Sequence, residues 1–354
     1  MECDSSVLIL SHEAGGGTEV FLQNYLHNNK TDKAIVLRPS QVPHDMVEWK
    51  VLLKNKNIKR IVVNHLLGFP LYKTMELLQQ LAVPYDVFLH DYFCICPNTS
   101  LDCQALHCHE FRLNDYCRYI FKARDMELID LSEYRRRFHL FLLGAANVIA
   151  PTHYAAGIIN ELYQDVHIAV QPHKLHGNIM RSFSNDFVNK PIITMAFLGT
   201  FCAQKGARYI LQLNAWIKKK SMPVRLVVIG EDMFDVAGDR TGIVFTGAYK
   251  QERVAQLLAI NKAAVVLIPS AFPETYCYTA SEAILAGFPV LTVNWGAQAM
   301  RVQKADCGWV IDRYMPDRGL EGMQRLVSYL TTPSGRLEIL TKAANTLNFQ
   351  NGME

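Results

Sequence analysis

Residues 272–282 read Phe-Pro-Glu-Thr-Tyr-Cys-Tyr-Thr-Ala-Ser-Glu, and the neighbouring runs place this stretch in a fold. The preceding run, Ala264–Pro269, is apolar, rich in β-branched residues and ended by proline, which is typical of a buried strand. The following run, Ala283–Gly287, indicates a short helix that stops at a glycine. The stretch therefore lies just beyond the carboxyl end of a predicted strand, where open α/β sheets bind their ligands.

This stretch holds two glutamates eight positions apart, Glu274 and Glu282. Because the residue before a proline avoids the α region, Pro273 predicts Glu274 on a loop and Glu282 inside the helix that follows. The backbone N–H groups of Tyr278–Ser281 would attract an anion such as phosphate, with Thr279 as the candidate cap. Two carboxylates on either side of an anion site suit a nucleotide sugar. The alternative is that both glutamates are simply solvated.

Length, composition and charge restrict the class of protein. The chain has 354 residues, more than one hydrophobic core usually organises, which predicts two domains. Half of the residues are apolar and 19% are charged, as in a packed α/β enzyme. A net charge of +3 without a basic stripe argues against nucleic acid as a partner. With nine cysteines, an acidic start unlike a signal peptide and no apolar run of membrane-spanning length, the expected location is cytoplasmic.

The first half of the chain alternates predicted strands with predicted helices, which favours a parallel, doubly wound sheet. A buried strand over residues 7–10 is followed by Gly15–Gly17 and a helical pattern, so the backbone could approach a phosphate closely. The glycine spacing fits neither a dinucleotide fingerprint nor a P-loop, and a flexible turn is an equal alternative. His65 and His90 each end a further predicted strand and could face a cleft. A lone histidine is more often a structural hydrogen-bonding residue, and this alternative is preferred for His65.

Two other segments of the first half carry less specific signals. Residues 91–117 are rich in cysteine and histidine, but the spacing lacks the paired pattern of structural zinc, so free thiols are preferred to a metal site. The cysteines are Cys94, Cys96, Cys103, Cys108 and Cys117, with His107 and His109 among them. Residues 133–143 predict a basic and apolar helix, in which Arg135–Arg137 could lie on an anionic membrane surface. The alternative there is a core helix with a solvated arginine face.

The second half repeats the alternation of strands and helices. A polar segment, residues 172–191, separates the halves, and the predicted domains are residues 1–188 and 189–354. The second half opens with a strand over 192–199, a turn through Lys205 and Gly206, and a helix. Further strands are predicted at residues 224–229, 244–247, 289–293 and 308–311. A second doubly wound domain follows, in which Lys205 is either a counter-charge for a diphosphate or a solvated lysine beside a turn.

Together these motifs resemble the two-domain GT-B glycosyltransferases of the retaining, family-4 kind. The specific match is an E-x7-E motif from Glu274 to Glu282, preceded by Phe272-Pro273 and followed by Ala286–Val290. Supporting matches are Gly15–Glu19, Leu198-Gly199 with Lys205-Gly206, and Gly308-Trp309. His90–Tyr92 with Cys96-Pro97 is similar to a subgroup acting in bacterial surface-polysaccharide assembly. The resemblance covers nearly the whole chain and is stronger in the second half.

The resemblance implies two Rossmann-like domains and retaining transfer of a sugar from a nucleotide-diphosphate donor to a glycan or lipid-linked acceptor, with no metal or other cofactor. Glu282 would hold the ribose hydroxyls, Glu274 would bond to the transferred sugar, and Lys205 would neutralise the departing diphosphate. His90 would contact the donor sugar or an acceptor hydroxyl. The remaining donor contacts would come from Gly16, Gly17, Gly199, Thr200, Arg208, Tyr276, Cys277, Tyr278 and Thr279.

Thr200 departs from the family, which often carries an arginine at this place. Arginine would provide a fixed bidentate clamp that threonine cannot, and Arg208 is the candidate replacement. The departure leaves a second interpretation open, a partner subunit that binds a nucleotide sugar with little or no turnover. A nucleotide-sugar epimerase on the same fold fits the motifs less well.

Overall fold

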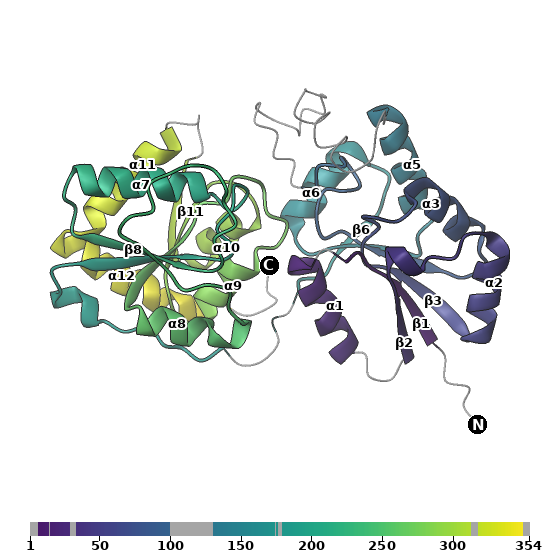
Figure 1. Cartoon of the computed structure of the whole chain (residues 1–354), viewed down its shortest axis with the longest axis horizontal. Coiled ribbons are helices and arrows are strands. Elements are labelled where there is room, and N and C mark those ends of the chain that lie inside the picture. Colours follow the sequence, from purple (N-terminus) through teal and green to yellow (C-terminus); the bar gives the residue numbers. More distant parts are fainter. Residues whose placement is uncertain are drawn as a thin grey trace. The chain divides into compact units, whose positions relative to one another are not determined.

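The computed structural model describes residues 6–13, 15–28, 33–99, 130–173, 175, 179–312 and 318–349. The chain divides into two compact units, Met1–His173 and Lys174–Glu354 (Figure 1). Among the described residues, no helix combines the length and the apolar character that crossing a bilayer requires.

The first unit is built on a six-stranded, all-parallel sheet with the strand order β2-β1-β3-β4-β5-β6. The strands are β1 (Ser6–Leu10), β2 (Lys33–Leu37), β3 (Ile58–Val63), β4 (Tyr85–Phe88), β5 (Asn147–Ala150) and β6 (Ile168–Val170). The helices are α1 (Gly16–Asn28), α2 (Met46–Asn55), α3 (Leu71–Gln80), α5 (Leu131–Leu143) and α6 (His153–Leu162), with a 3-10 turn η1 (Pro39–Gln41). Helix α2 was not predicted; it is capped by Asp45, whose side chain accepts the N–H groups of Val47 and Glu48.

Alternating side chains of this sheet point to its two faces. Leu8 and Leu10 belong to the larger core, which also contains apolar residues of α2, α3 and α5. Val7 and Ile9 belong to a smaller core with Leu22 of α1. In Figure 1, α1 lies on one side of the sheet and α2, α3 and α5 on the other. The sheet is therefore doubly wound, as predicted.

The second unit has the same architecture, with the parallel strand order β12-β11-β10-β7-β8-β9. The strands are β7 (Ile193–Leu198), β8 (Val224–Ile229), β9 (Ile243–Phe245), β10 (Ala263–Ile268), β11 (Val290–Val293) and β12 (Gly308–Ile311). The helices are α7 (Ala207–Lys219), α8 (Val254–Ile260), α9 (Tyr278–Leu285), α10 (Ala297–Ala305), α11 (Arg318–Leu330) and α12 (Pro333–Asn345). Three 3-10 turns, η3 (Asp186–Asn189), η4 (Gln251–Arg253) and η5 (Thr346–Asn348), complete it. One face of the sheet packs on α7, α11 and α12, and the other on α8, α9 and α10.

Each sheet has one strand from which the chain continues first to one side of the sheet and then to the other. In the first sheet β1 lies between β2 and β3, and in the second β7 lies between β8 and β10. The helices that follow β7 and β10 cover opposite faces of the sheet, so the direction of winding changes between these two strands. Ligand sites of doubly wound sheets lie at such positions.

The division between the units falls after His173, whereas the predicted boundary lies after residue 188. The intervening segment is polar in composition, but Phe183 and Phe187 pack into the cores of the second unit. The N–H of Ser182 also donates to the carbonyl of Ala286, at 3.0 Å. The buried side chain of Phe187 and the half-buried side chain of Phe183 therefore join this segment to the second unit, which its average composition does not reveal.

Arg336 of α12 holds the end of that segment in place. Its side chain is buried, and Nη1 donates to the carbonyls of Phe187, Val188 and Lys190 at 2.6, 3.1 and 2.5 Å. We expect Arg336→Met to lower the free energy of unfolding by about 3 kcal/mol, because the carbonyls lose a charged donor. Urea denaturation measures the change. Arg325→Met, on the exposed side of α11, is the control and should stay within about 0.5 kcal/mol of the parent. Equal losses in the two variants would contradict this account.

Candidate functional site

Two loops of the second unit meet beside the point where the strand order reverses. Residues 199–206 follow β7 and residues 269–277 follow β10. The N–H of Ala271 donates to the carbonyl of Gln204 at 2.8 Å. A Cβ added at Gly206 would lie 2.0 Å from the carbonyl oxygen of Pro269, and the φ of Gly206 is +87°. Only glycine permits this approach, which brings Lys205 next to Glu274.

Lys205 and Glu274 form an ion pair at the contact of the two loops. Lys205 Nζ lies 2.8 Å from Glu274 Oε2, and the hydroxyl of Ser270 donates to Oε1. The Glu274 side chain is 5% exposed and that of Lys205 is 29% exposed, so the alternative of a solvated glutamate on this loop is wrong. Burial alone would lower the pKa of Lys205, but the Glu274 carboxylate outweighs it and the pKa is raised. Each carboxylate oxygen keeps a second lone pair that a ligand hydroxyl could use.

A third loop supports the backbone of Glu274. The N–H of Ala297, the first residue of α10, donates to the Glu274 carbonyl at 2.8 Å. Strand β11, which precedes that loop, pairs with β10 in the sheet. Glu274 is therefore fixed by its main chain as well as by its side chain, although it lies on a loop, as predicted.

Helix α9 begins at Tyr278, after Cys277 in the left-handed conformation with φ +63°. Thr279 is already the second helical residue, so the prediction that it caps the helix is wrong. Arg301 of α10 holds the turn, since its Nη1 donates to the carbonyls of Tyr276 and Cys277 at 2.8 and 3.2 Å. Helix α9 thus begins four residues after Glu274, and the N-termini of helices attract anions.

The unusual backbone at Cys277 gives a direct test of this turn. We expect Cys277→Val to lower the free energy of unfolding by about 2–3 kcal/mol, because a β-branched side chain is strongly disfavoured in the left-handed region. The free energy of unfolding of Cys277→Gly should remain within about 1 kcal/mol of the parent. Glycine relieves the backbone strain at this positive φ, which offsets the greater conformational freedom that glycine gives the unfolded chain. Thermal unfolding measures both, with Cys277→Ala as the unbranched control. A valine variant as stable as the alanine variant would exclude the left-handed turn.

Glu282 lies in the middle of α9 and is also buried. Its side chain accepts a long hydrogen bond from the hydroxyl of Tyr249, 3.4 Å from Oε2. Burial raises the pKa of Glu282 to about 7, and Tyr249 and Lys205 limit the rise. The alternative of a solvated helix glutamate is therefore wrong. A buried carboxyl with unused lone pairs suits a ligand that brings its own hydroxyl donors.

The other residues that were predicted to contact the donor differ in how exposed their side chains are. Gly199 is buried and packs against Thr279 of α9. Thr200 is exposed, and so is Arg208 in the first turn of α7. Tyr276 is buried and Tyr278 half-buried, with ring centroids 4.8 Å apart. Lys205 is thus the cation in contact with Glu274 in the described part of the chain, and Arg208 forms no ion pair with it there.

In the first unit, the predicted residues follow β1, β3 and β4. Helix α1 begins at Gly16 with φ +72°, a conformation that glycine adopts freely. His65 accepts the N–H of Leu67 at Nδ1, and its Nε2 lies 3.1 Å from Asp91 Oδ2. These contacts fit the preferred interpretation of His65 as a structural hydrogen-bonding residue. Nε2 of His90 lies 2.7 Å from Oδ1 of Asn64.

The geometry in the second unit coincides with a family match. Residues 181–329 match the family model described as "Glycosyl transferases group 1". The matched range contains Lys205, Glu274 and Glu282 and the turn between them. No curated protein matches the chain.

Solved structures with the same architecture extend the likeness to both units. Sucrose-phosphate synthase (tll1590) from Thermosynechococcus elongatus has a TM-score of 0.63 and 15% identity over 97% of each chain. Anabaena Alr3699/HepE in complex with UDP-glucose has a TM-score of 0.62 and 15% identity over 97% of this chain and 93% of its own. WaaG, a glycosyltransferase involved in lipopolysaccharide biosynthesis, has a TM-score of 0.60 and 14% identity over 97% and 95%. These likenesses establish the GT-B fold, and the predicted fold class is confirmed.

Two cysteines of the cysteine-rich segment, Cys94 and Cys96, lie among the described residues and belong to the larger core of the first unit. Cys94 and Cys96 have buried side chains, and burial raises the pKa of the Cys94 thiol. The other predicted members, Cys103, Cys108, Cys117, His107 and His109, lie outside the described residues. Among the residues that the structure does describe, no group of His, Cys, Asp and Glu side chains is arranged to hold a metal ion.

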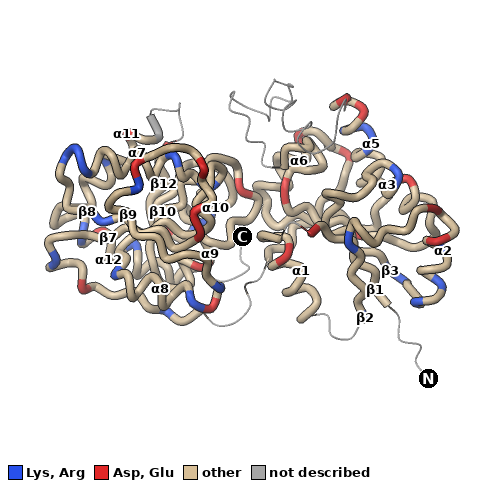
Figure 2. The backbone as a smooth tube through the Cα atoms, viewed as in Figure 1, with Lys and Arg blue, Asp and Glu red and all other residues tan. Residues whose placement is uncertain are grey.

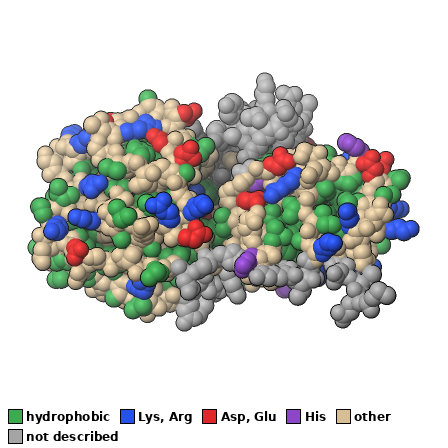
Figure 3. Space-filling model, turned by 60° about the horizontal axis from the view of Figure 1, so that its bottom comes forward, with side chains coloured by type: hydrophobic (Ala, Val, Ile, Leu, Met, Phe, Trp, Pro, Cys, Tyr) green, Lys and Arg blue, Asp and Glu red, His purple; other side chains and the backbone are tan. Residues whose placement is uncertain are grey.

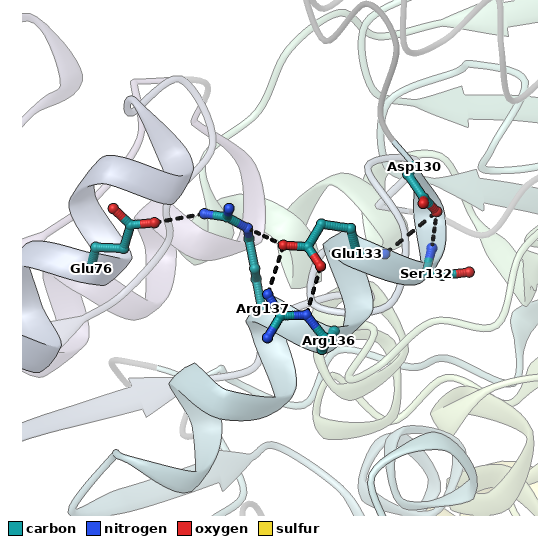
Figure 4. A network of polar contacts seen from close by, with 6 residues as sticks. All are labelled: Glu76, Asp130, Ser132, Glu133, Arg136 and Arg137. Atoms are coloured by element: carbon teal, nitrogen blue, oxygen red, sulfur yellow. Dashed lines mark hydrogen bonds and ion pairs between the residues drawn. The ribbon is translucent and has the colours of Figure 1, made fainter.

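Arg136 and Arg137 of α5 form ion pairs with neighbouring carboxylates (Figure 4). Glu133 accepts from Arg136 at 2.6 and 2.8 Å and from Arg137 at 2.7 Å, and Arg137 also reaches Glu76 of α3 at 2.7 Å. Arg135 donates to the carbonyl of Ile95 at 3.1 Å. Acidic and basic positions accordingly lie side by side along α3 and α5 (Figure 2). On the face in Figure 3, Lys and Arg side chains are scattered rather than gathered into a stripe.

Four side chains of the site were not predicted from the sequence. Ser270 and Arg301 hold the Glu274 loop, Tyr249 contacts Glu282, and Asn64 contacts His90. Ser270 alone had a local signal, because it lies four residues before Glu274 on the same loop. The other three depend on packing between segments far apart in the chain.

Proposed function

We propose that this protein is a retaining glycosyltransferase that moves a sugar from a nucleotide-diphosphate donor to a glycan or lipid-linked acceptor. The observation that carries the proposal is the buried Lys205–Glu274 pair at the amino end of α9, with the buried carboxyl of Glu282 in the same helix. The match of residues 181–329 to group 1 glycosyl transferases supports it.

The candidate site residues of the second unit each have a role in this reaction. Glu282 accepts hydrogen bonds from the ribose hydroxyls, and the N–H groups at the start of α9 receive the diphosphate. Lys205 turns from Glu274 toward the diphosphate as negative charge grows on it, which stabilises the transition state. Glu274 then uses its freed lone pairs to orient the hydroxyls of the transferred sugar.

In the first unit, Gly16 and Gly17 bring backbone N–H groups to the diphosphate, and His90 contacts the donor sugar or the acceptor hydroxyl. We assign the protein to the family-4 type on the E-x7-E motif, and to polysaccharide biosynthesis in the cytoplasm on the His90–Tyr92 motif. No metal or cofactor has a role in this proposal.

The first experiment is a thermal-shift screen of nucleotide sugars, followed by product analysis with each donor that binds. UDP-glucose is the first donor to test, because the Anabaena protein of the same fold was crystallised with it. A donor at a hundredfold excess over its Kd should add about 2.7 kcal/mol of stability. Failure of every nucleotide sugar both to stabilise the protein and to be consumed would refute the proposal.

A second candidate is a nucleotide-sugar-binding subunit without appreciable turnover. The observation that favours it is that Thr200 and Arg208 are both exposed. Among the described residues, Lys205 is then the cation that pairs with Glu274. The two candidates differ in one result. Stabilisation by a donor without hydrolysis or transfer supports the binding subunit, and transfer that is lost in Glu274→Gln supports the enzyme.

We further propose a peripheral membrane contact through the Arg135–Arg137 region of α5. Arg136, Leu140 and Leu143 share one face of the helix and are exposed, and the opposite face is buried in the core. Because Glu133 offsets part of the charge, the leucines should supply most of the affinity. We expect binding to vesicles with anionic lipid at low salt, weakened by Leu140→Asp and unchanged by Val244→Asp in β9. No binding, or equal losses in both variants, would exclude this surface.

A further inference from the structure

A buried chain of hydrogen bonds crosses the ends of three neighbouring strands of the first unit. Ser11 follows β1, Asn64 follows β3 and His90 lies two residues beyond β4, and these strands are adjacent in the sheet. Asn64 Nδ2 donates to Ser11 Oγ at 2.8 Å, and Asn64 Oδ1 lies 2.7 Å from His90 Nε2. Ser11 and Asn64 are 1% and 0% exposed.

The chemistry of the amide sets the position of the proton on His90. An amide nitrogen only donates and an amide oxygen only accepts, so with Nδ2 directed at Ser11, Asn64 presents an acceptor to the ring. Nε2 of His90 must then carry the proton. In a neutral imidazole the other nitrogen, Nδ1, has no proton and acts as an acceptor.

The surroundings of His90 favour the neutral ring. Burial lowers the pKa of His90 well below 6.5, and the neighbouring His173, His65 and His12 lower it further. Phe21 of α1 and Phe88 of β4 pack on the ring, with centroids 4.6 and 6.1 Å away. The ring therefore has one proton at neutral pH, and the contact with Asn64 decides which nitrogen holds it.

We propose that Asn64 is a positioning residue that fixes the orientation and the tautomer of His90. The inference rests on the proposed function, in which His90 contacts the donor sugar or the acceptor hydroxyl. With Nε2–H bonded to Asn64, the neutral ring has no second proton to donate. Ser11 acts one step further away, because it orients the amide of Asn64.

The tautomer can be measured without any substrate. The two ring nitrogens differ in ¹⁵N chemical shift according to which one carries the proton, and His90→Gln identifies the His90 signals in the full-length protein. We expect the Nε2–H tautomer at pH 7. A ring protonated at Nδ1, or at both nitrogens, would overturn the inference whether or not the protein transfers sugar.

Two variants then connect the tautomer to the reaction. Asn64→Leu keeps the approximate size of the side chain but offers no acceptor, so the Nε2–H signature should be lost and kcat should fall at least tenfold, with the donor KM within about threefold. Ser11→Ala leaves Oδ1 of Asn64 in place but removes the acceptor that orients the amide, so it should weaken the signature and lower kcat less than Asn64→Leu does. Parental tautomer and kcat in Asn64→Leu would overturn the positioning role. Absence of transfer in the unaltered protein would count against the proposed function, and the chemical shifts alone would then decide the role of Asn64.

Discussion

Replacing Glu282 with glutamine is expected to raise the free energy of unfolding by about 3 kcal/mol at pH 8 and to weaken donor binding. Glu282 is 6% exposed, and burial raises its pKa to about 7 from the ordinary value of 4.5. One pKa unit corresponds to about 1.4 kcal/mol, so holding the ionised carboxylate in the folded protein costs about 3 kcal/mol. Glutamine has the same shape and can still accept from Tyr249, but it has no charge to bury.

The gain in stability should depend on pH in one direction. Below pH 4.5 Glu282 is protonated in the folded and unfolded states, and the variant gains nothing. Between about pH 4.5 and 7 the folded protein binds more protons than the unfolded chain, so the parent loses stability as pH rises. Above pH 7 the difference between variant and parent is complete and constant. Urea denaturation from pH 4 to pH 8 measures it, and a pH-independent difference would contradict the raised pKa.

Donor binding should change in the opposite sense. Hydrogen bonds to a charged group contribute about 1 kcal/mol more than neutral ones, so the variant should bind a nucleotide sugar about fivefold more weakly at pH 8. Tyr249→Phe is the control, because it keeps the carboxylate and removes only the 3.4 Å contact. Its donor affinity should stay within about threefold. A variant that is more stable but binds less well would show that the fold tolerates this buried charge for its function.

Local features of the sequence were sufficient for the sheets and for the placement of both glutamates. The apolar run Ala264–Pro269 marks β10, and Pro273 separates the loop that carries Glu274 from the helix that carries Glu282. These signals depend only on neighbouring residues and are therefore readable in one sequence. Gly287 likewise indicates the end of α9 without knowledge of the fold.

Contacts between distant segments could not be predicted. Lys205 and Glu274 are 69 residues apart and meet because Gly206 lets the loop after β7 lie against Pro269. The cap at Thr279 was wrong for a related reason: Arg301, from the next helix, stabilises the left-handed turn at Cys277 and shifts the start of α9. The domain boundary also depends on contacts between distant segments, because Phe183 and Phe187 pack into the cores of the second unit.

Replacing Glu274 with glutamine is expected to lower the rate of sugar transfer by about a thousandfold while donor affinity changes little. The glutamine can keep both contacts, because its oxygen can accept from Lys205 and its amide nitrogen can donate to Ser270. The negative charge beside the reacting sugar is lost, and removal of one such electrostatic group typically lowers kcat by about 10²–10³. The loss falls on kcat because the ribose and diphosphate contacts are unchanged.

Stability and a matched variant separate this effect from unfolding. Lys205 is 29% exposed and can be solvated once its partner is neutral, so the variant should lose only about 1–2 kcal/mol of stability. Ser270→Ala is the control, since it removes one donor to Glu274 and keeps the charge, and its kcat should fall about tenfold at most. Initial rates of transfer and donor titrations at pH 8 measure these quantities. A Glu274→Gln variant that keeps more than a tenth of the parental kcat would place the chemistry elsewhere, because a charge in contact with the reacting sugar cannot be removed at so small a cost in rate.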